Sequence, residues 1–221
     1  MPAVTTTTGA VLAAALGAPL GSLLNLVAYR LPRGEPLTGP GPRAARPFPR
    51  VELATAVLLA LVVITQSADR EAWLGLVLVA LLVPIALIDL DHRVIPNKLT
   101  GPGCVAALAS LGLTAPGDLQ ENVIAALAAG GFLLVAAIAY PSGMGMGDVK
   151  LAAMMGLFLG RAVIPAMVVA LLAGSVAGIV VMRRKGIAEG RKTGIPFGPF
   201  LAFGALVGLY AGDAIMDWYL S

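Results

Sequence analysis

The feature that most constrains the fold of this 221-residue chain is a succession of eight apolar segments joined by polar loops. The segments run over residues 9–29, 51–66, 72–88, 94–114, 122–140, 149–160, 162–182 and 195–216. Because a helix of about 20 apolar residues crosses the hydrocarbon core of a bilayer, most of these segments are close to the length of a membrane span. The pattern therefore predicts an all-α, polytopic membrane helix bundle with about eight transmembrane segments.

The composition supports a membrane protein and excludes several other classes. Only 12% of the residues are charged, about half the usual share for a soluble domain, and the mean hydropathy is +0.91. One cysteine and the lack of a glycine period exclude disulfide-rich and collagen-like chains. The spans leave little chain for anything else, so residues 1–221 are predicted to form a single membrane-embedded domain.

The sixth segment, residues 149–160, is short for a membrane span. Its 12 residues rise only about 18 Å as a helix, against a hydrocarbon core of about 30 Å. Either this helix begins inside a cavity, or the sixth and seventh segments divide differently around Gly160, Arg161 and Pro165. Small residues elsewhere are expected to let membrane helices pack closely, in particular Gly17, Gly21, Gly130 and Gly131.

The placement of the basic residues predicts the topology. Thirteen of the 15 Lys and Arg residues fall in the loops after the first, third, fifth and seventh segments. Cytoplasmic loops are enriched in basic residues, so these loops are predicted to be cytoplasmic and both termini to lie outside. The acidic residues divide evenly, which leaves a net charge of +7 on the inner face and −4 on the outer face.

This charge distribution also bears on partners and targeting. Orientation and contact with anionic lipids explain the basic loops, so no nucleic-acid partner is expected. Residues 1–8 carry no Lys or Arg before the apolar segment, whereas a secretory signal begins with a basic region. The N-terminus is therefore predicted to be an N-out first helix and not a cleavable signal. Residues 30–50 are predicted to form an extended cytoplasmic loop.

Acidic residues next to apolar segments are the candidates for chemistry. Asp89 and Asp91 follow the third segment, and Asp148 directly precedes the sixth. Both sites fall on the predicted cytoplasmic side, and acids at membrane depth tend to be functional. Each has a structural alternative: Asp148 is placed to cap a helix N-terminus, and Asp91 to pair with Arg93 in the headgroup region. Asp89 is predicted to follow its helix, where the dipole disfavours a carboxylate.

Two carboxylates that share a site form an acid–base pair. One takes a proton from water while the other, protonated, polarises a carbonyl and later protonates the leaving amine. Helix ends favour the anion at Asp148 and the neutral acid at Asp89, which predicts Asp148 as base and Asp89 as acid. The sequence lacks the residues for a zinc site. Cys104 and His92 are its only cysteine and histidine, and such a site needs about four ligands.

Four motifs together resemble the type IV prepilin peptidases, which are membrane aspartyl proteases of the GxGD kind. They are GSLLNLVAYRLPRGEP at 21–36, IDLDHRVIPN at 88–97, GMGMGDVKL at 143–151 and GIPFGPFLAFG at 194–204. They occur in the family's order and cover nearly the whole chain.

The resemblance implies a substrate and a set of site residues. Such enzymes remove leader peptides from prepilins or pseudopilins at the cytoplasmic face of the bacterial inner membrane, and need no cofactor for proteolysis. The family's catalytic aspartates fall on Asp89 and Asp148, with Asp91 beside the first. Supporting or substrate-binding roles fall on other residues of the two motifs: Asp91, Pro96, Asn97, Gly145, Gly147 and Lys150.

One departure from the family concerns methylation and metal binding. Many members also methylate the new N-terminus with S-adenosylmethionine, and they carry two CxxC pairs in the first cytoplasmic loop. Here that loop, PLTGPGPRAARPFPR at 36–50, has no cysteine, so no zinc is expected. Methyltransferase activity is left open, because Gly21, Asn25, Arg30 and Pro32 of the preceding motif persist. The oligomeric state is open as well.

Two other functions compete with this interpretation. A small transporter or proton pathway would use the two aspartates as a proton relay, but it predicts broken helices in matching halves, and only one segment is Gly-interrupted. A protease of the presenilin or signal-peptide-peptidase type would carry Tyr-Asp and Pro-Ala-Leu motifs. Here Ile88 precedes Asp89, and the sequence at 195–197 is Ile-Pro-Phe.

Overall fold

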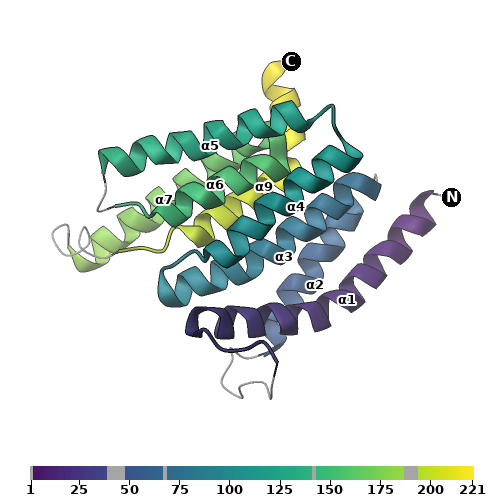
Figure 1. Ribbon diagram of the computed structural model, residues 1–221, viewed down its shortest axis with the longest axis horizontal. Helices are drawn as coiled ribbons and strands as arrows, with labels where there is room; N and C mark the ends of the chain where they lie inside the picture. The colour runs from purple at the N-terminus through teal and green to yellow at the C-terminus, as the bar shows by residue number, and fades with distance from the viewer. Residues whose placement is uncertain (1, 39–47, 67–68, 141–142, 187–193) are drawn as a thin grey trace. The chain divides into compact units, whose positions relative to one another are not determined.

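The protein is all-helical over the part of the chain that the structure describes. The structure is a computed structural model, and it describes residues 2–38, 48–66, 69–140, 143–186 and 194–221 (Figure 1). Over these residues the chain forms α1 (Pro2–Arg30), α2 (Phe48–Thr65), α3 (Asp69–His92), α4 (Asn97–Thr114), α5 (Leu119–Ala139), α6 (Met146–Leu159), α7 (Val163–Lys185) and α9 (Gly198–Leu220). Two short 3₁₀ helices, η1 (Leu31–Arg33) and η2 (Gly160–Ala162), follow α1 and α6.

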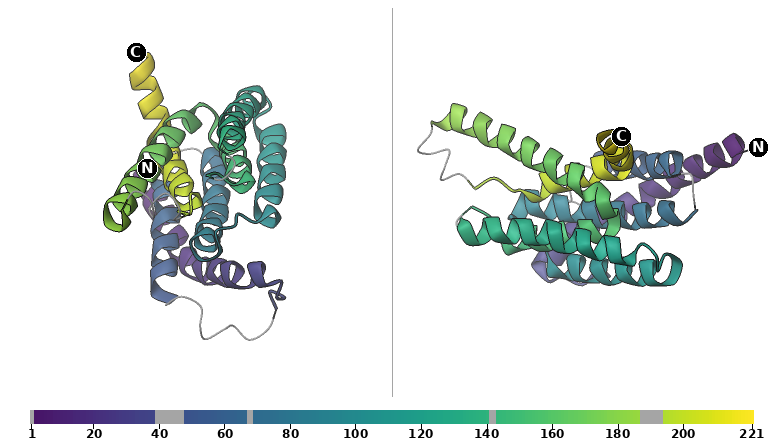
Figure 2. Two further views of the ribbon diagram at one scale, coloured as in Figure 1. Left: turned by 90° about the vertical axis from the view of Figure 1, so that its left-hand side faces the viewer. Right: turned by 90° about the horizontal axis from the view of Figure 1, so that it is seen from above.

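The helices group into two compact units. The first, Met1–His92, contains α1, α2 and α3, and the second, Arg93–Ser221, contains α4, α5, α6, α7 and α9. Within the first unit α2 packs along α1, and within the second α6 packs along α5 and α9 along α7 (Figures 1 and 2).

Each predicted segment falls on one of these helices, although several ends differ. The first helix begins at Pro2, seven residues before the predicted start, and α3 continues through Asp89 and Asp91 to His92. Hydropathy marks only the apolar part of a helix, whereas backbone hydrogen bonds continue into polar turns. The predicted division near Gly160 is confirmed, since η2 separates α6 from α7. Residues 39–47 of the predicted 30–50 loop lie outside the described residues.

Five stretches of the described residues are long and apolar enough to cross a membrane. They are Gly9–Arg33, Ala72–His92, Leu119–Ala139, Met146–Lys185 and Gly198–Leu220. The fourth contains both α6 and α7. The protein is therefore a multi-pass membrane helix bundle, and the total of eight spans stays a prediction.

The distribution of residue sizes in α5 is the reverse of that in a soluble helix. Its buried positions are mostly small, and its exposed positions include Leu127, Phe132, Val135 and Ile138, each more than half exposed. The buried positions are Asn122, Ala125, Ala126, Ala129, Gly130, Leu133 and Ala137. In lipid, large apolar side chains gain nothing by moving inward, so helices associate through small residues that let the backbones approach.

Close packing of this kind joins α5 to α6. A Cβ placed at Gly130 would lie 2.9 Å from the Cβ of Ala153, and one at Gly156 would lie 2.5 Å from the Cα of Ala126. Gly131 does not share this role, because a Cβ there would meet nothing within 4 Å. The prediction of close packing is therefore confirmed for Gly130 and wrong for Gly131, which points away from the neighbouring helix.

Close packing at glycine also joins α9 to α7 and α1 to α2. Glycines spaced four apart on α9 face alanines spaced four apart on η2 and α7, namely Gly204, Gly208 and Gly212 against Ala162, Ala166 and Ala170. A Cβ at Gly208 would lie 2.8 Å from the Cβ of Ala166. In the first unit, Gly17 packs against Ala56 and Gly21 against Glu52, as predicted. A Cβ added at either glycine would lie less than 3 Å from the Cα of the facing residue.

Adjacent glycines on α5 offer a matched test of this packing. Gly130→Leu forces a side chain into Ala153 and should lower the free energy of unfolding by about 1–3 kcal/mol. Gly131→Leu meets open space and gains helix propensity, so it should leave stability unchanged or slightly raised. Thermal unfolding of both variants in the same detergent measures the difference, and equal destabilisation would contradict the assigned interface.

Candidate active site

The first candidate carboxylate, Asp89, lies on the last turn of α3 and is buried, with 5% of its surface exposed. The expectation that it follows the helix is wrong, because α3 ends three residues later. The expectation that Asp89 favours its neutral form stays a prediction, which is consistent with this position because the negative end of the helix dipole acts over the whole last turn. Asp91 is exposed, on the same turn. About half a helical turn of α3 therefore separates the buried Asp89 from the exposed Asp91.

Helix α3 stops at a residue in an unusual backbone conformation. Arg93 has φ 53°, the left-handed region, and is the only non-glycine residue with positive φ among those described. Helices often end with such a residue, but glycine usually provides it. An arginine here carries a modest conformational strain that the surrounding structure must offset. Nothing in the sequence signalled this conformation.

The second candidate carboxylate, Asp148, lies in the first turn of α6. The helix begins at Met146 with Gly145 as its N-cap, so the expectation that Asp148 directly precedes the helix is wrong by three residues. Its side chain is buried and accepts a hydrogen bond of 3.1 Å from the Gly145 N–H, which is one half of a capping box, because glycine has no side chain to complete it. Asp148 therefore does cap the helix, but from the third helical position. This bond and the helix N-terminus both favour its anionic form.

The second unit brings parts of three sequence motifs together around α6. The Lys150 ammonium donates a 2.9 Å hydrogen bond to Oδ1 of Asn97, the first residue of α4. A Cβ at Gly147 would lie 2.9 Å from the Cβ of Ile95, and one at Gly194 would lie 3.5 Å from Nη1 of Arg93. Segments 93–97, 145–150 and the start of 194–204 therefore adjoin one another within this unit.

These contacts redefine the role of the glycines before Asp148. Glycines beside a reactive residue can leave a flexible, side-chain-free approach for a substrate. None of Gly143, Gly145 and Gly147 is in the left-handed region, and Gly147 is needed because Ile95 occupies the space beside it. A Cβ at Gly145 would meet only Asp148 and Gly147, at 3.5 Å and beyond. Gly147 is therefore a packing residue, whereas Gly145 leaves space beside it.

The residues linked to methylation lie in the first unit. Asn25 and Arg30 of α1 are buried, at 4% and 6% exposure, and Nη1 of Arg30 donates a 2.8 Å hydrogen bond to the Pro36 carbonyl. Gly21 is covered by α2, and Pro32 is exposed in η1. Beside Gly21, the Ser22 hydroxyl donates a hydrogen bond to the Glu52 carboxylate. The motif thus serves to pack α1 against α2 and to turn the chain after α1.

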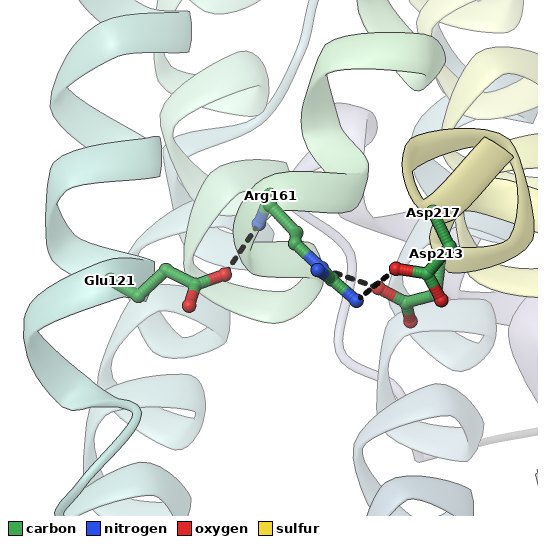
Figure 3. A network of polar contacts seen from close by, with 4 residues as sticks. All are labelled: Glu121, Arg161, Asp213 and Asp217. Atoms are coloured by element: carbon green, nitrogen blue, oxygen red, sulfur yellow. Dashed lines mark hydrogen bonds and ion pairs between the residues drawn. The ribbon is translucent and has the colours of Figure 1, made fainter. Parts of the chain in front are cut away.

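A polar network at the far end of α6 was not predicted. Buried Asn122 of α5 donates a 2.7 Å hydrogen bond to the carbonyl of Leu157. The Arg161 N–H donates to Glu121 at 3.1 Å, and its guanidinium pairs with Asp213 at 3.2 Å and Asp217 at 3.0 Å (Figure 3). The sequence indicated only that Glu121, Arg161, Asp213 and Asp217 are charges on the predicted outer face. Their spacing in the sequence gives no sign that they meet.

Metal binding finds no support in the described ranges, where no three His, Cys, Asp or Glu side chains are grouped to hold an ion. Cys104 is half-buried on α4 and has no disulfide.

Comparison with known proteins agrees with these motifs. Residues 76–182 match the model of the type IV leader peptidase family, a range that contains Asp89 and Asp148. A protein of Aeromonas hydrophila named prepilin leader peptidase/N-methyltransferase is 32% identical over 213 residues, covering 92% of this chain and 72% of its own length. A Bacillus subtilis (strain 168) protein of the same name is 31% identical, covering 81% and 72% respectively.

The chain belongs to the type IV leader peptidase family. The resemblance seen in the sequence is thereby confirmed. A further relative with the same printed name, from Aeromonas salmonicida (strain A449), is 34% identical over 182 residues, covering 79% of this chain. This chain spans 61% of that leader peptidase's length. No solved structure matches the chain.

The two glycines flanking Met146 give a matched test of the site's packing. Gly147→Ala places a methyl group against Ile95 and should lower the unfolding temperature by several degrees, as expected for about 1–2 kcal/mol of overpacking. Gly145→Ala meets only ordinary contacts and should be nearly neutral. Thermal unfolding in detergent measures both, and the reverse order would refute the packing role of Gly147.

Proposed function

We propose that this protein is a leader peptidase that cleaves prepilins or pseudopilins with Asp89 and Asp148 as a catalytic pair. The observation that carries the proposal is the burial of an aspartate in each of two family motifs, both in helix-terminal turns. An ionisable side chain at membrane depth costs free energy, so it is retained chiefly where it has a function. Membership of the family and the printed names of the relatives favour proteolysis over a proton relay.

In this mechanism the two carboxylates divide acid and base work. One carboxylate accepts a proton from water as the water oxygen attacks the scissile carbonyl carbon. The other donates a proton to the carbonyl oxygen, which gives a gem-diol. As the diol collapses and the C–N bond breaks, the first carboxylate passes its proton to the leaving nitrogen, and the second takes its own proton back from the diol. The capping bond to Gly145 and the helix N-terminus support Asp148 as the initial base. The C-terminal turn of α3 supports Asp89 as the initial acid.

The orientation of the site follows from the charge distribution. We propose eight spans in a single membrane-embedded domain of the cytoplasmic membrane, with both termini outside and the catalytic aspartates toward the cytoplasm. The exposed Arg183, Arg184 and Lys185 at the end of α7 support this orientation and suit contact with anionic lipids. The substrate would present its leader on the cytoplasmic side and its apolar helix to the bilayer.

Methylation of the new N-terminus receives less support from the structure. S-adenosylmethionine would supply the methyl group, and the relatives' names include this activity. The residues assigned to it do not fit a cofactor cradle, however, because α2 fills the space beside Gly21 and Arg30 binds the Pro36 carbonyl. We therefore derive no methyl-transfer step, and Gly21, Asn25, Arg30 and Pro32 are assigned to the packing and turning of the first unit.

The catalytic pair is tested by co-expression with a candidate prepilin, with loss of the leader followed by gel shift. Asp89→Asn and Asp148→Asn should each lower processing by about a hundredfold or more, because neither amide can exchange the proton. Asp91→Ala should retain activity, because Asp91 is exposed and lies outside the proposed pair.

The asparagine variant at Asp148 separates catalysis from capping. Asp148→Ala also removes the acceptor for the Gly145 N–H and should cost about 0.5–2 kcal/mol of stability, whereas Asp148→Asn keeps an acceptor oxygen. Full processing by Asp148→Asn, with loss only in Asp148→Ala, would show that the carboxylate is a cap and not a catalyst.

The mass of the processed N-terminus tests methylation. Because the Gly21 and Arg30 region is filled by the protein itself, we expect the mature product to carry an unmodified amine. Mass spectrometry of the product from the same co-expression decides this, and a product heavier by one methyl group would show that the transferase activity is retained.

A further inference from the structure

We propose that a polar clamp at the outer end of α6 fixes the depth of Asp148, and that Asn122 is its central positioning residue. The clamp consists of Glu121 and Asn122 on α5, Arg161 in η2, and Asp213 and Asp217 on α9 (Figure 3). The inference rests on the proposed function only where processing is measured.

Helix α6 is too short to reach both faces of a bilayer. Its 14 residues rise about 21 Å, whereas the 21 residues of α5 rise about 31 Å, close to a full hydrocarbon core. A partial span is tolerated because α6 is enclosed by protein, with Leu151, Met154 and Met155 completely buried. Fixing one end of α6 at a membrane face therefore leaves the other end below the opposite face.

The clamp supplies that fixed end. The Leu157 carbonyl is among the last carbonyls of α6, which lack partners within the helix, and the buried Asn122 amide satisfies it at 2.7 Å. The turn that follows α6 needs Gly160, which has φ 53°. A Cβ at Gly160 would lie 3.0 Å from the side-chain Oδ1 of Asn122. Charged Arg161, Asp213 and Asp217 are exposed beyond this turn and belong at the water interface.

The register between α5 and α6 gives the resulting depth of Asp148. The helices run antiparallel, with Ala126 opposite Gly156 and Gly130 opposite Ala153. Continuing this register places Asp148 level with Leu134 and Val135, whereas α5 continues inward to Ala139. The difference is four to five residues, or about 7 Å. The carboxylate thus lies about 7 Å below the inner end of α5, where a substrate bond must be drawn in to reach it.

Inserting cysteines one at a time into a Cys104→Ala background tests the depth directly. Nitroxide labels at Met146→Cys and Tyr140→Cys, both exposed positions, report depth from their accessibility to oxygen and to a nickel chelate in phospholipid vesicles. The same register places Met146 level with Ala136 and Ala137, so its label should lie about 5 Å deeper than the label at Tyr140. Equal or shallower depth at Met146 would overturn the assignment of α6 as a partial span.

Removal of the clamp bond tests the positioning role. Asn122→Leu leaves the Leu157 carbonyl unsatisfied, so the Met146 label should move toward the surface and kcat should fall about tenfold or more, with KM within about twofold. Gln120→Leu makes the same chemical change at an exposed site on α5 and should alter neither. Native depth and native kcat in Asn122→Leu would overturn the positioning role.

Two further arrangements keep the test decisive. If Asn122→Leu does not accumulate, Arg161→Gln loosens the clamp through α9 alone, and it should shift the Met146 label in the same direction. An unshifted label there would also count against the clamp. The depth measurement needs no peptidase activity. Full processing by Asp148→Asn would therefore contradict the proposed function and leave the depth result standing.

Discussion

Close approach of helix backbones is the interaction on which the rest of this structure depends. In a hydrocarbon solvent, burial of large apolar side chains does not drive association, so stability must come from dispersion contacts and from the few polar bonds inside. The second unit shows how this is met, with Gly130 and Gly156 between α5 and α6, and Gly208 against Ala166 between α7 and α9. Large side chains such as Leu127 and Ile138 are left facing outward, where lipid covers them.

Close packing also explains how Asp148, the carboxylate that we propose as catalytic, can lie on a short helix. With α4, α5 and α9 around it, α6 need not match the bilayer thickness. Its N-terminal turn can then be built for chemistry, with Gly145, Asp148 and Lys150 placed by backbone and side-chain bonds and not by the membrane surface. A short helix enclosed by protein leaves polar backbone groups at both ends. The Asn122 amide satisfies a carbonyl at one end, and the Asp148 carboxylate accepts the Gly145 N–H at the other.

Much of this could be predicted from the sequence, since hydropathy alone determines where membrane helices lie. The segments at 122–140 and 162–182 were placed within a few residues, and the break at Gly160 was anticipated. The polar turns at the helix ends were not predicted: α3 runs past Asp89 to His92, and α6 starts at Met146. Backbone hydrogen bonds continue into residues that are no longer apolar, so hydropathy does not mark these ends. Contacts between distant residues, such as Arg161 with Asp213, and the left-handed Arg93 left no local pattern to read.

At Asp148 the structural role and the proposed catalytic role do not compete. The Asp148 carboxylate accepts the Gly145 N–H in the first turn of α6, where the helix N-terminus favours an anion, and a base must be anionic before it takes a proton from water. A cap at an exposed helix end would serve stability alone, since water would compete for both oxygens. Here the side chain is buried beside Val149, so the hydrogen bond that orders the helix also orients the reactive oxygen. In the mechanism that we propose, burial makes this capping residue a preorganised base.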